Sequence, residues 1–404
     1  MAKVKITGHA SGSGVITVTA PNTSTDRTIT LPDSTDTLIG TATTDALTTR
    51  VNGAGGRKNM IINGAMNVAQ RGASQAGYTA AGYYTCDRWF HDKDGSTGTF
   101  TMTQEADAPD GFKNSLKVNC TTAGSSGAYN AIQTRLESQD TAHLAYGTSS
   151  AKAITLSFWV KVSQTGNQQM NLIHHADAGS RQISFVYTIN QANTWEKKTV
   201  TFAGDTTRVG DDDNTNGFYL EWFLSSYSGR TGSSVLTSWG SYTNTARFEG
   251  ATISIGDSTS DTWQIAGVQL EVGSVATDFE YRSYGEELAL CQRYYQRFGA
   301  PDDAQVLSFA GMCVSASVVY FAGQTYVPMR AQPSGSSVNP SNFRVRNASN
   351  SGIPSISSLG VSAYSPTHFI ATAENASGLT AGHASHLFNY TGSQYGYVQL
   401  DAEL

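Results

Sequence analysis

The stretch Ile154–Val162, which reads ITLSFWVKV, decides the fold class of this chain. Its side chains alternate between an apolar set and a more polar set: Leu156, Phe158, Val160 and Val162 against Thr155, Ser157, Trp159 and Lys161. Successive side chains of a strand point to opposite faces, so this pattern predicts a strand that turns one face to a core. Residues 183–189 and 218–224 repeat the pattern. Residues 58–282 are therefore expected to form a jelly-roll β-sandwich of antiparallel strands.

The composition favours an all-β protein. Charged residues make up only 14% of the 404 residues, while glycine occurs 40 times. Scarce charged helix formers and plentiful turn residues are typical of short strands joined by tight turns. The 19 Tyr, 16 Phe and 6 Trp supply apolar surface for real cores. The net charge is -6 and no run of Lys or Arg is present, which argues against nucleic acid as a partner.

The sequence also bears on where the protein works. No apolar stretch approaches the roughly 20 residues of a membrane-spanning helix, so no membrane insertion is expected. The opening MAKVKITG lacks the apolar region of a signal peptide. The four cysteines are expected to be reduced core thiols rather than a disulfide framework: Cys86, Cys120, Cys291 and Cys313. A chain made in a cytoplasm, yet with an extracellular composition, is typical of a virion component.

The chain is expected to have five parts: a β segment at 1–40, a linker with a short helical turn at 41–57, the jelly roll at 58–282, a linking helix at 283–299 and a C-terminal β-sandwich at 300–404. The first part is too short to close a core, so it needs a neighbouring copy or another protein. The helix is predicted by a capping box of Ser283 and Glu286. Leu288, Cys291 and Tyr295 follow at helical spacing.

Candidate metal ligands do not form a convincing site. Residues 212–217 resemble the first half of an EF-hand loop, but Phe223 stands where the bidentate Glu should be. A solvated acidic turn is the favoured interpretation, and a calcium site of another kind is the alternative. His174 and His175 are adjacent on a strand and should point to opposite faces. For His383 and His386 we favour surface or packing roles, and no metal or other cofactor is expected.

Motifs for catalysis are missing as well. The sequence contains no G-x-S-x-G nucleophile motif and no G-x-x-x-x-G-K-[ST] phosphate-binding loop. The most suggestive acid is Glu221, which lies between Tyr219 and Phe223 on one strand face. Glycoside hydrolysis needs a second carboxylate across the bond, and spacing along a sequence does not reveal one. We expect a solvated or hydrogen-bonded role for Glu221 and no catalytic residue, so the protein is not expected to be an enzyme.

Aromatic side chains are the better functional candidates. Sugar rings stack on Trp and Tyr because their slightly positive C–H faces meet the negative face of the ring. Trp159 shares the polar face of its strand with Ser157 and Lys161, and it would form the floor of a glycan groove on an exposed sheet. The alternative is that a loop, the helix or another subunit covers it. The candidates in the last module are Tyr390, Tyr395 and Tyr397, for which trimer packing is the alternative role.

Several motifs resemble those of tail-fibre proteins of tailed bacteriophages. The matching segments are Asn59–Gly64, Gln70–Gly72, Tyr84–Trp89, Leu156–Lys161, Thr194–Trp195, Gly267–Gly273, Phe279–Arg282, Leu288–Tyr295, Met329–Pro333 and Asp401–Leu404. Residues 14–30 are similar to virion-attachment segments of such fibres. The resemblance is patchy, but it extends over nearly the whole chain.

The resemblance implies a homotrimer with a jelly roll like that of carbohydrate-binding modules. Residues 1–40 would attach to other tail or baseplate proteins, and distal β domains, with 300–404 as the receptor-binding tip, would recognise a host-surface glycan. The protein would work in the virion tail after assembly in the host cytoplasm. The alternatives are a baseplate or fibre adaptor without host contact and, third, a glycan depolymerase.

Overall fold

The computed structural model describes residues 57–94, 98–124, 129–226, 229–299, 308–347, 356, 358–374, 378–389 and 396–404. The predicted attachment segment at 1–40 and all of the 41–57 linker except Arg57 lie outside the described residues. The described part of the chain belongs to one compact unit, which spans Thr48–Leu404. Within this part, no helix has the length and apolar character needed to cross a bilayer.

One layer of the sandwich is a six-stranded antiparallel sheet. Its strands, in spatial order, are β1 (Ser74–Tyr78), β4 (Thr99–Glu105), β5 (Ser115–Thr122), β13 (Thr262–Val272), β7 (Ile154–Val162) and β10 (Glu196–Phe202). β7 is an interior strand of this layer, because it pairs with the edge strand β10 on one side and with β13 on the other. The stretch that predicted the fold is therefore paired along both of its edges.

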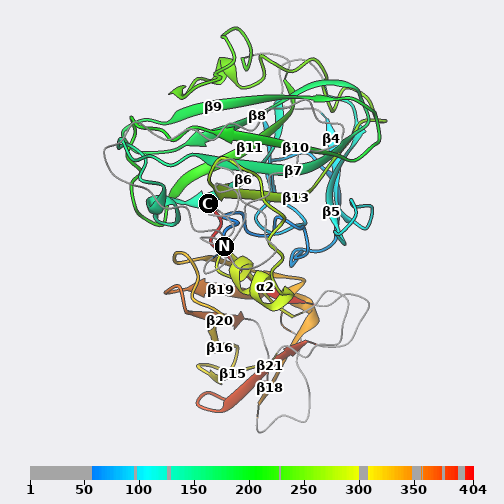
Figure 1. Ribbon diagram of the computed structural model, residues 1–404. Helices are drawn as coiled ribbons and strands as arrows, with labels where there is room; N and C mark the ends of the chain where they lie inside the picture. The colour runs from blue at the N-terminus through cyan, green and yellow to red at the C-terminus, as the bar shows by residue number, and fades with distance from the viewer. Residues whose placement is uncertain are drawn as a thin grey trace, which may run out of the picture. The chain divides into compact units, whose positions relative to one another are not determined.

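The other layer is a seven-stranded sheet. Its strands, in spatial order, are β12 (Gly240–Ser241), β9 (Arg181–Ile189), β8 (Gly166–His174), β11 (Asn216–Ser226), β6 (Tyr129–Glu137), β3 (Phe90–Asp94) and β2 (Gly82–Tyr83). Two short 3-10 helices accompany it, η1 (Ser138–Leu144) and η2 (Asn244–Ala246). Figure 1 shows the long strands of both layers in colours from cyan through green to yellow-green.

The core lies between these two sheets. The apolar side chains of β7 and β11 enter it with at most 1% of their surface exposed: Leu156, Phe158, Val160, Val162, Phe218, Leu220, Trp222 and Leu224. Removing such side chains from water stabilises the fold by about 1.5–3 kcal/mol each. The predicted alternation and the all-β fold class with its β-sandwich are confirmed. All four cysteines are buried free thiols, as expected.

The helix is shorter than predicted. α2 spans Tyr284–Gln292, and the Ser283 Oγ accepts a hydrogen bond of 3.3 Å from the Glu286 backbone N–H, which is half of the predicted capping box. The Glu286 carboxylate pairs with Arg57 at 2.7 Å instead of closing the other half. The predicted extension to residue 299 is wrong, because 295–298 form a strand. Tyr295 is therefore the first residue of this strand and does not lie on the helix.

The last module contains two further antiparallel sheets. The three-stranded sheet has the order β14 (Tyr295–Phe298), β22 (Tyr397–Asp401) and β17 (Ser334–Val338). The six-stranded sheet has the order β18 (Phe343–Asn347), β21 (Ala384–Asn389), β15 (Ser308–Cys313), β16 (Val318–Gln324), β20 (His368–Glu374) and β19 (Ser358–Ala363), with the 3-10 helix η3 (Pro340–Asn342) before β18. A second apolar cluster forms here, with Phe321, Phe343, Phe369 and Leu387 at its centre.

The end of β22 is tied to the jelly-roll sandwich by buried arginines. Arg88, of which 1% of the side chain is exposed, pairs with Glu403. Arg71 reaches Glu403 at 3.2 Å and Asp401 at 3.0 Å. Deleting the last module would leave these two arginines without their carboxylate partners. The deletion would therefore destabilise the sandwich, because a buried charge without a partner is costly. A binding experiment on a truncated protein would therefore not separate a loss of binding from a loss of stability, and the full chain is needed.

Candidate functional site

Trp159 lies half-buried on the outer face of the six-stranded sheet. It pairs across the strands with Lys197 of β10 and Ala266 of β13. A pocket of about 270 Å³ opens beside it, and we call this the Trp159 pocket. The residues that line it are Phe112, Ser157, Trp159, Lys197, Gly267, Thr277, Asp278, Phe279 and Tyr281. The predicted candidate is thus part of an actual concavity.

Three aromatic rings from two loops stand beside Trp159. Phe112 and Phe279 meet edge to face with centroids 5.0 Å apart, and Phe279 and Tyr281 meet in the same way at 5.0 Å. Of these, Tyr281 is 61% exposed. Rings that brace one another in this way offer rigid apolar walls at a low entropic cost.

Gly267 makes the close approach of Phe112 to the sheet possible. The register of β13 against β7 shifts between Ala266 and Gln269, which is a bulge. Gly267 has φ +60° there, and a Cβ at this position would lie 2.5 Å from Cζ of Phe112. A larger residue would therefore be strained and would push the phenyl ring away.

A polar cluster borders the pocket on the same sheet face. Asp107 accepts hydrogen bonds from Lys161 Nζ at 2.7 Å and Trp195 Nε1 at 3.2 Å, and a longer one from Gln264 Nε2 at 3.4 Å. The bond from Lys161 contributes most to holding the pKa of Asp107 below its usual value. The carboxylate is therefore ionised at neutral pH and can accept hydrogen bonds from hydroxyl groups.

The other predicted binding residues are placed differently. Tyr390 and Tyr395 lie outside the described residues. Tyr397 is half-buried in β22, and the guanidinium of Arg297 stacks over its ring at 3.6 Å from the centroid. One face of that ring is already used, which leaves Trp159 as the better placed aromatic residue among those that the structure describes.

Glu221 points out of the seven-stranded sheet and is nevertheless completely buried. It forms a two-pronged ion pair with Arg247, whose Nε lies 2.9 Å from Oε1. Asn171 at 3.1 Å and Gln133 at 2.9 Å complete its hydrogen bonds. A carboxylate so enclosed does not reach a substrate, so the structure gives Glu221 a packing role.

Residues 229–250 cover this face of the sheet. Gln169 Nε2 donates to the Ala246 carbonyl at 2.7 Å, and Asn171 Nδ2 donates to the Arg247 carbonyl at 2.9 Å. Phe248 packs on Phe223 with ring centroids 5.8 Å apart. We call this surface the covered face. We call the part of the outer surface of the six-stranded sheet around Trp159, Lys161 and Lys197 the open face, because residues 277 and 278 lie over Gln269 and Glu271 of the neighbouring strand β13.

The candidate metal ligands are also used internally. His174 is buried, stacks on Phe218 and lies 3.4 Å from Asp205. In the acidic turn, Asp213 accepts hydrogen bonds from the backbone N–H and hydroxyl of Thr215, at 2.9 and 2.6 Å. Across the described ranges, no three His, Cys, Asp or Glu side chains come together as a metal site.

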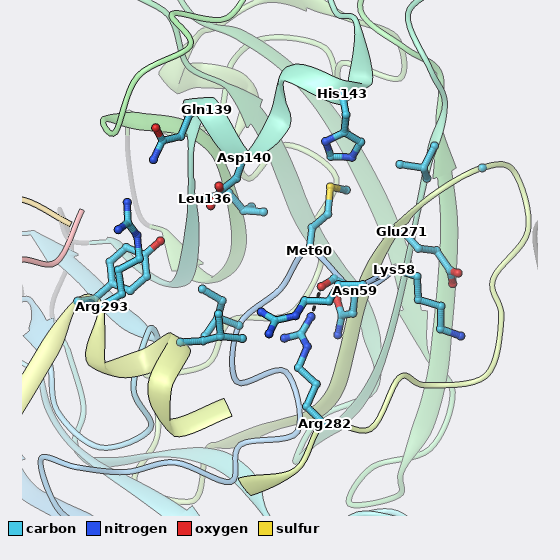
Figure 2. A pocket seen from close by; sticks show the side chains of 16 residues that line it. Lys58, Asn59, Met60, Leu136, Gln139, Asp140, His143, Glu271, Arg282 and Arg293 are labelled. Carbon is cyan, nitrogen blue, oxygen red and sulfur yellow. Dashed lines mark hydrogen bonds between the residues drawn. The ribbon is translucent and has the colours of Figure 1, made fainter. Parts of the chain in front are cut away.

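A larger cavity of about 760 Å³ lies between the jelly-roll sandwich and α2. Figure 2 shows Met60 and Leu136 in it, with Asp140, His143 and Arg282 around them. Arg282 donates to the Asn59 carbonyl, a bond drawn as a dashed line in Figure 2.

Cations around this cavity already have structural partners. Lys58 Nζ donates to Thr277 Oγ1 at 2.6 Å, and Arg293 binds the Glu137 carboxylate with two bonds of 2.7 Å. Arg57, also on the lining, pairs with Glu286 of α2. The pairs of Arg57 and Arg293 join α2 to its surroundings, and Lys58 is bound to the segment after β13. We assign no ligand to this cavity.

Sequence reasoning singled out Trp159 as a candidate but did not predict a binding role for the residues that the structure places around it. Asp107 and Phe112 lie roughly fifty residues before Trp159 in the chain, and Trp195 lies 36 residues after it, so only folding brings them together. Phe279 and Tyr281 stood out as a motif of the resembled family, but no binding role was predicted for them. The alternation of aromatic residues at 279 and 281 was the one available signal.

Comparisons with known proteins give distant structural neighbours. No family model matches the chain, and no curated protein matches it either. The enzymatically active domain of tailspike protein 4 from bacteriophage CBA120 has 12% identity and a TM-score of 0.30, covering 53% of this chain and 21% of that domain. The chain thus matches about a fifth of the length of that domain.

Two other neighbours are matched over nearly their whole length. A putative sugar binding protein from Bacteroides thetaiotaomicron has 13% identity and a TM-score of 0.29, with coverage of 53% of this chain and 100% of that one. A family 11 carbohydrate-binding module from Clostridium thermocellum, solved with a mixed-linked tetrasaccharide, has 10% identity and a TM-score of 0.27, covering 51% and 99%. Identities and TM-scores this low do not assign a function. Any functional conclusion has to rest on the side chains of this protein.

Proposed function

We propose that the protein is a tail-fibre component of a bacteriophage that binds a host-surface glycan at the Trp159 pocket. The observation that carries the proposal is the half-buried indole of Trp159 beside an aromatic-walled pocket on the open face. An apolar ring face suits the C–H face of a sugar, and Asp107 nearby can accept hydrogen bonds from hydroxyl groups.

The place in a virion is supported by the motif resemblance, which extends from residues 14–30 to Asp401–Leu404. In this proposal residues 1–40 join other tail or baseplate proteins, and three copies assemble into a homotrimer. A shallow single site binds sugar weakly, and three linked sites would gain affinity through avidity. Sedimentation of the purified protein checks the assembly, since a monodisperse monomer would contradict it.

Binding without hydrolysis is the activity that this arrangement supports. Glu221, the acid that the sequence singled out, is buried against Arg247 on the covered face. Glycoside hydrolysis requires two accessible carboxyl groups on either side of the bond. Incubation with host polysaccharide should accordingly release no new reducing ends.

The test uses the full chain, adsorbed to host cells and to an array of bacterial surface polysaccharides. Trp159→Ala should weaken binding at least about tenfold, because it removes the stacking surface. The matched control is Tyr364→Ala, which removes a 69% exposed ring of the last module. We expect this control to bind like the unmodified protein.

Each other outcome has a clear meaning. Loss of binding with Tyr364→Ala alone would move recognition to the last module. Absence of binding by the correctly assembled unmodified protein would support the adaptor alternative and overturn the glycan proposal. Circular dichroism and the thermal midpoint of each variant establish that a loss of binding is not a loss of fold.

A further inference from the structure

We infer that the open face binds a neutral, linear oligosaccharide that extends across two tryptophans, Trp159 and Trp195. The inference rests on the proposed function and specifies the class of glycan. It goes beyond the Trp159 pocket, because Trp195 does not line that pocket.

The strand register places the two indoles on one sheet face. Trp159 is opposite Lys197, and Glu196 is opposite Val160. Trp195 immediately precedes β10, so continuing this register puts it opposite Lys161, diagonal to Trp159. Diagonal neighbours across two strands are about 7–8 Å apart, close enough for one extended ligand to contact both rings.

Trp195 is held in position by its polar edge. Its Nε1–H donates to Asp107 at 3.2 Å, and Lys161 fixes the same carboxylate at 2.7 Å. A tryptophan anchored in this way loses little conformational freedom when a ligand stacks on it. The polar cluster also provides groups that can hydrogen-bond sugar hydroxyls alongside the second ring.

The size of the Trp159 pocket limits how much of a glycan it can hold. Its volume is about 270 Å³. Enclosed sites for small molecules typically measure roughly 300–1,000 Å³. A pocket of this size has room for a single sugar ring, so the further units of a longer glycan would lie on the surrounding sheet face, where Trp195 is located.

The charges at this site balance. Lys161 and Lys197 carry two positive charges, and Asp107 and Asp278 carry two negative charges. A site for an acidic sugar would need an excess of positive charge. The balance favours a neutral glycan, whose binding should depend little on salt.

The experiment uses the full chain and size-fractionated fragments of the polysaccharide that binds best in the array. The fragments have one to six sugar units, and affinity is measured by titration calorimetry. Affinity should rise about tenfold from the shortest fragments that bind to longer ones, because a second ring then stacks. Trp195→Ala should remove this gain, so that longer fragments bind no more tightly to the variant than the shortest ones do.

Trp159→Ala distinguishes a failure of the proposed function from a failure of the two-tryptophan inference. If it leaves binding of every fragment unchanged, the proposed function at the Trp159 pocket fails. If it abolishes binding while Trp195→Ala has no effect on any length, the function stands and the two-tryptophan inference is overturned. A tenfold or larger loss of affinity between 50 mM and 500 mM NaCl would contradict the neutral class and indicate an acidic glycan.

Discussion

The open face and the covered face of the jelly-roll sandwich are built from the same kind of strand, yet they differ in what their outward side chains contact. On the covered face, Glu221 and its neighbours are sealed beneath residues 229–250. On the open face, Trp159 borders a pocket and Lys197 is exposed. An outward polar residue is therefore a functional candidate only where no other segment lies over it.

The largest expected effect tests how firmly the covered face is closed. Glu221→Gln should destabilise the protein by about 3–5 kcal/mol, because it leaves the buried Arg247 guanidinium with only the more distant Asp92 carboxylate, at 3.8 Å, as a counter-charge. Urea unfolding followed by tryptophan fluorescence measures this change. The double variant Glu221→Leu with Arg247→Met is the control and should recover much of the loss. If Glu221→Gln had the same urea unfolding midpoint as the unmodified protein, the covered face would have to be accessible to water.

Two neighbours on β7 contrast the core with the open face. Phe158→Ala should cost about 3–5 kcal/mol, since its ring is fully buried and a cavity would remain. Trp159→Ala should change the free energy of unfolding by no more than about 1.5 kcal/mol, because its ring is only half-buried. Thermal melts of both variants provide the measurement. Equal losses would mean that Trp159 belongs to the core and is not a surface for sugar.

The free energy of unfolding should depend on pH through His91, a buried residue of β3 in the seven-stranded sheet. Burial lowers the pKa of His91 from 6.5 to about 3, and the neutral ring lies between Tyr78 at 2.6 Å and Asn130 at 3.2 Å. Because this pKa is lower in the folded state, the stability from neutral His91 is complete above pH 6.5. It is lost as the pH falls towards 3, by at most about 1.4 kcal/mol per pH unit.

His91→Gln should therefore flatten the dependence of the unfolding midpoint on pH between 6.5 and 4. Urea midpoints at several pH values for the variant and the unmodified protein provide the comparison. Parallel profiles would contradict a neutral buried imidazole.

The smallest effect comes from an ion pair on the open face. Lys161 and Asp107 have side chains 21% and 46% exposed, in contrast to the buried pair of Glu221 and Arg247. Lys161→Met should change stability by less than about 1 kcal/mol, since water and salt already screen the pair. Differential scanning fluorimetry is sufficient for this measurement. A loss of stability as large as that of Glu221→Gln would show that the two faces do not differ in how strongly their ion pairs stabilise the fold.

Local patterns in the sequence were enough for the strands and the fold class. The alternation in Ile154–Val162 is a property of neighbouring residues, and it correctly placed Phe158 inside and Trp159 outside. The same reasoning failed at Tyr295, where helical spacing continued past the end of α2. Pairing of β14 with β22, about a hundred residues later, outweighed the local preference.

Adjacent residues were enough to predict an all-β chain with a half-polar strand face bearing Trp159, because period-two alternation depends only on neighbouring positions. The tertiary structure alone decided which outward face is open. Burial of Glu221 depends on Arg247, and the walls beside Trp159 depend on Phe112 and Phe279. Such contacts join residues far apart in the chain, and their geometry is set by the packing of whole sheets and loops, which no local pattern contains.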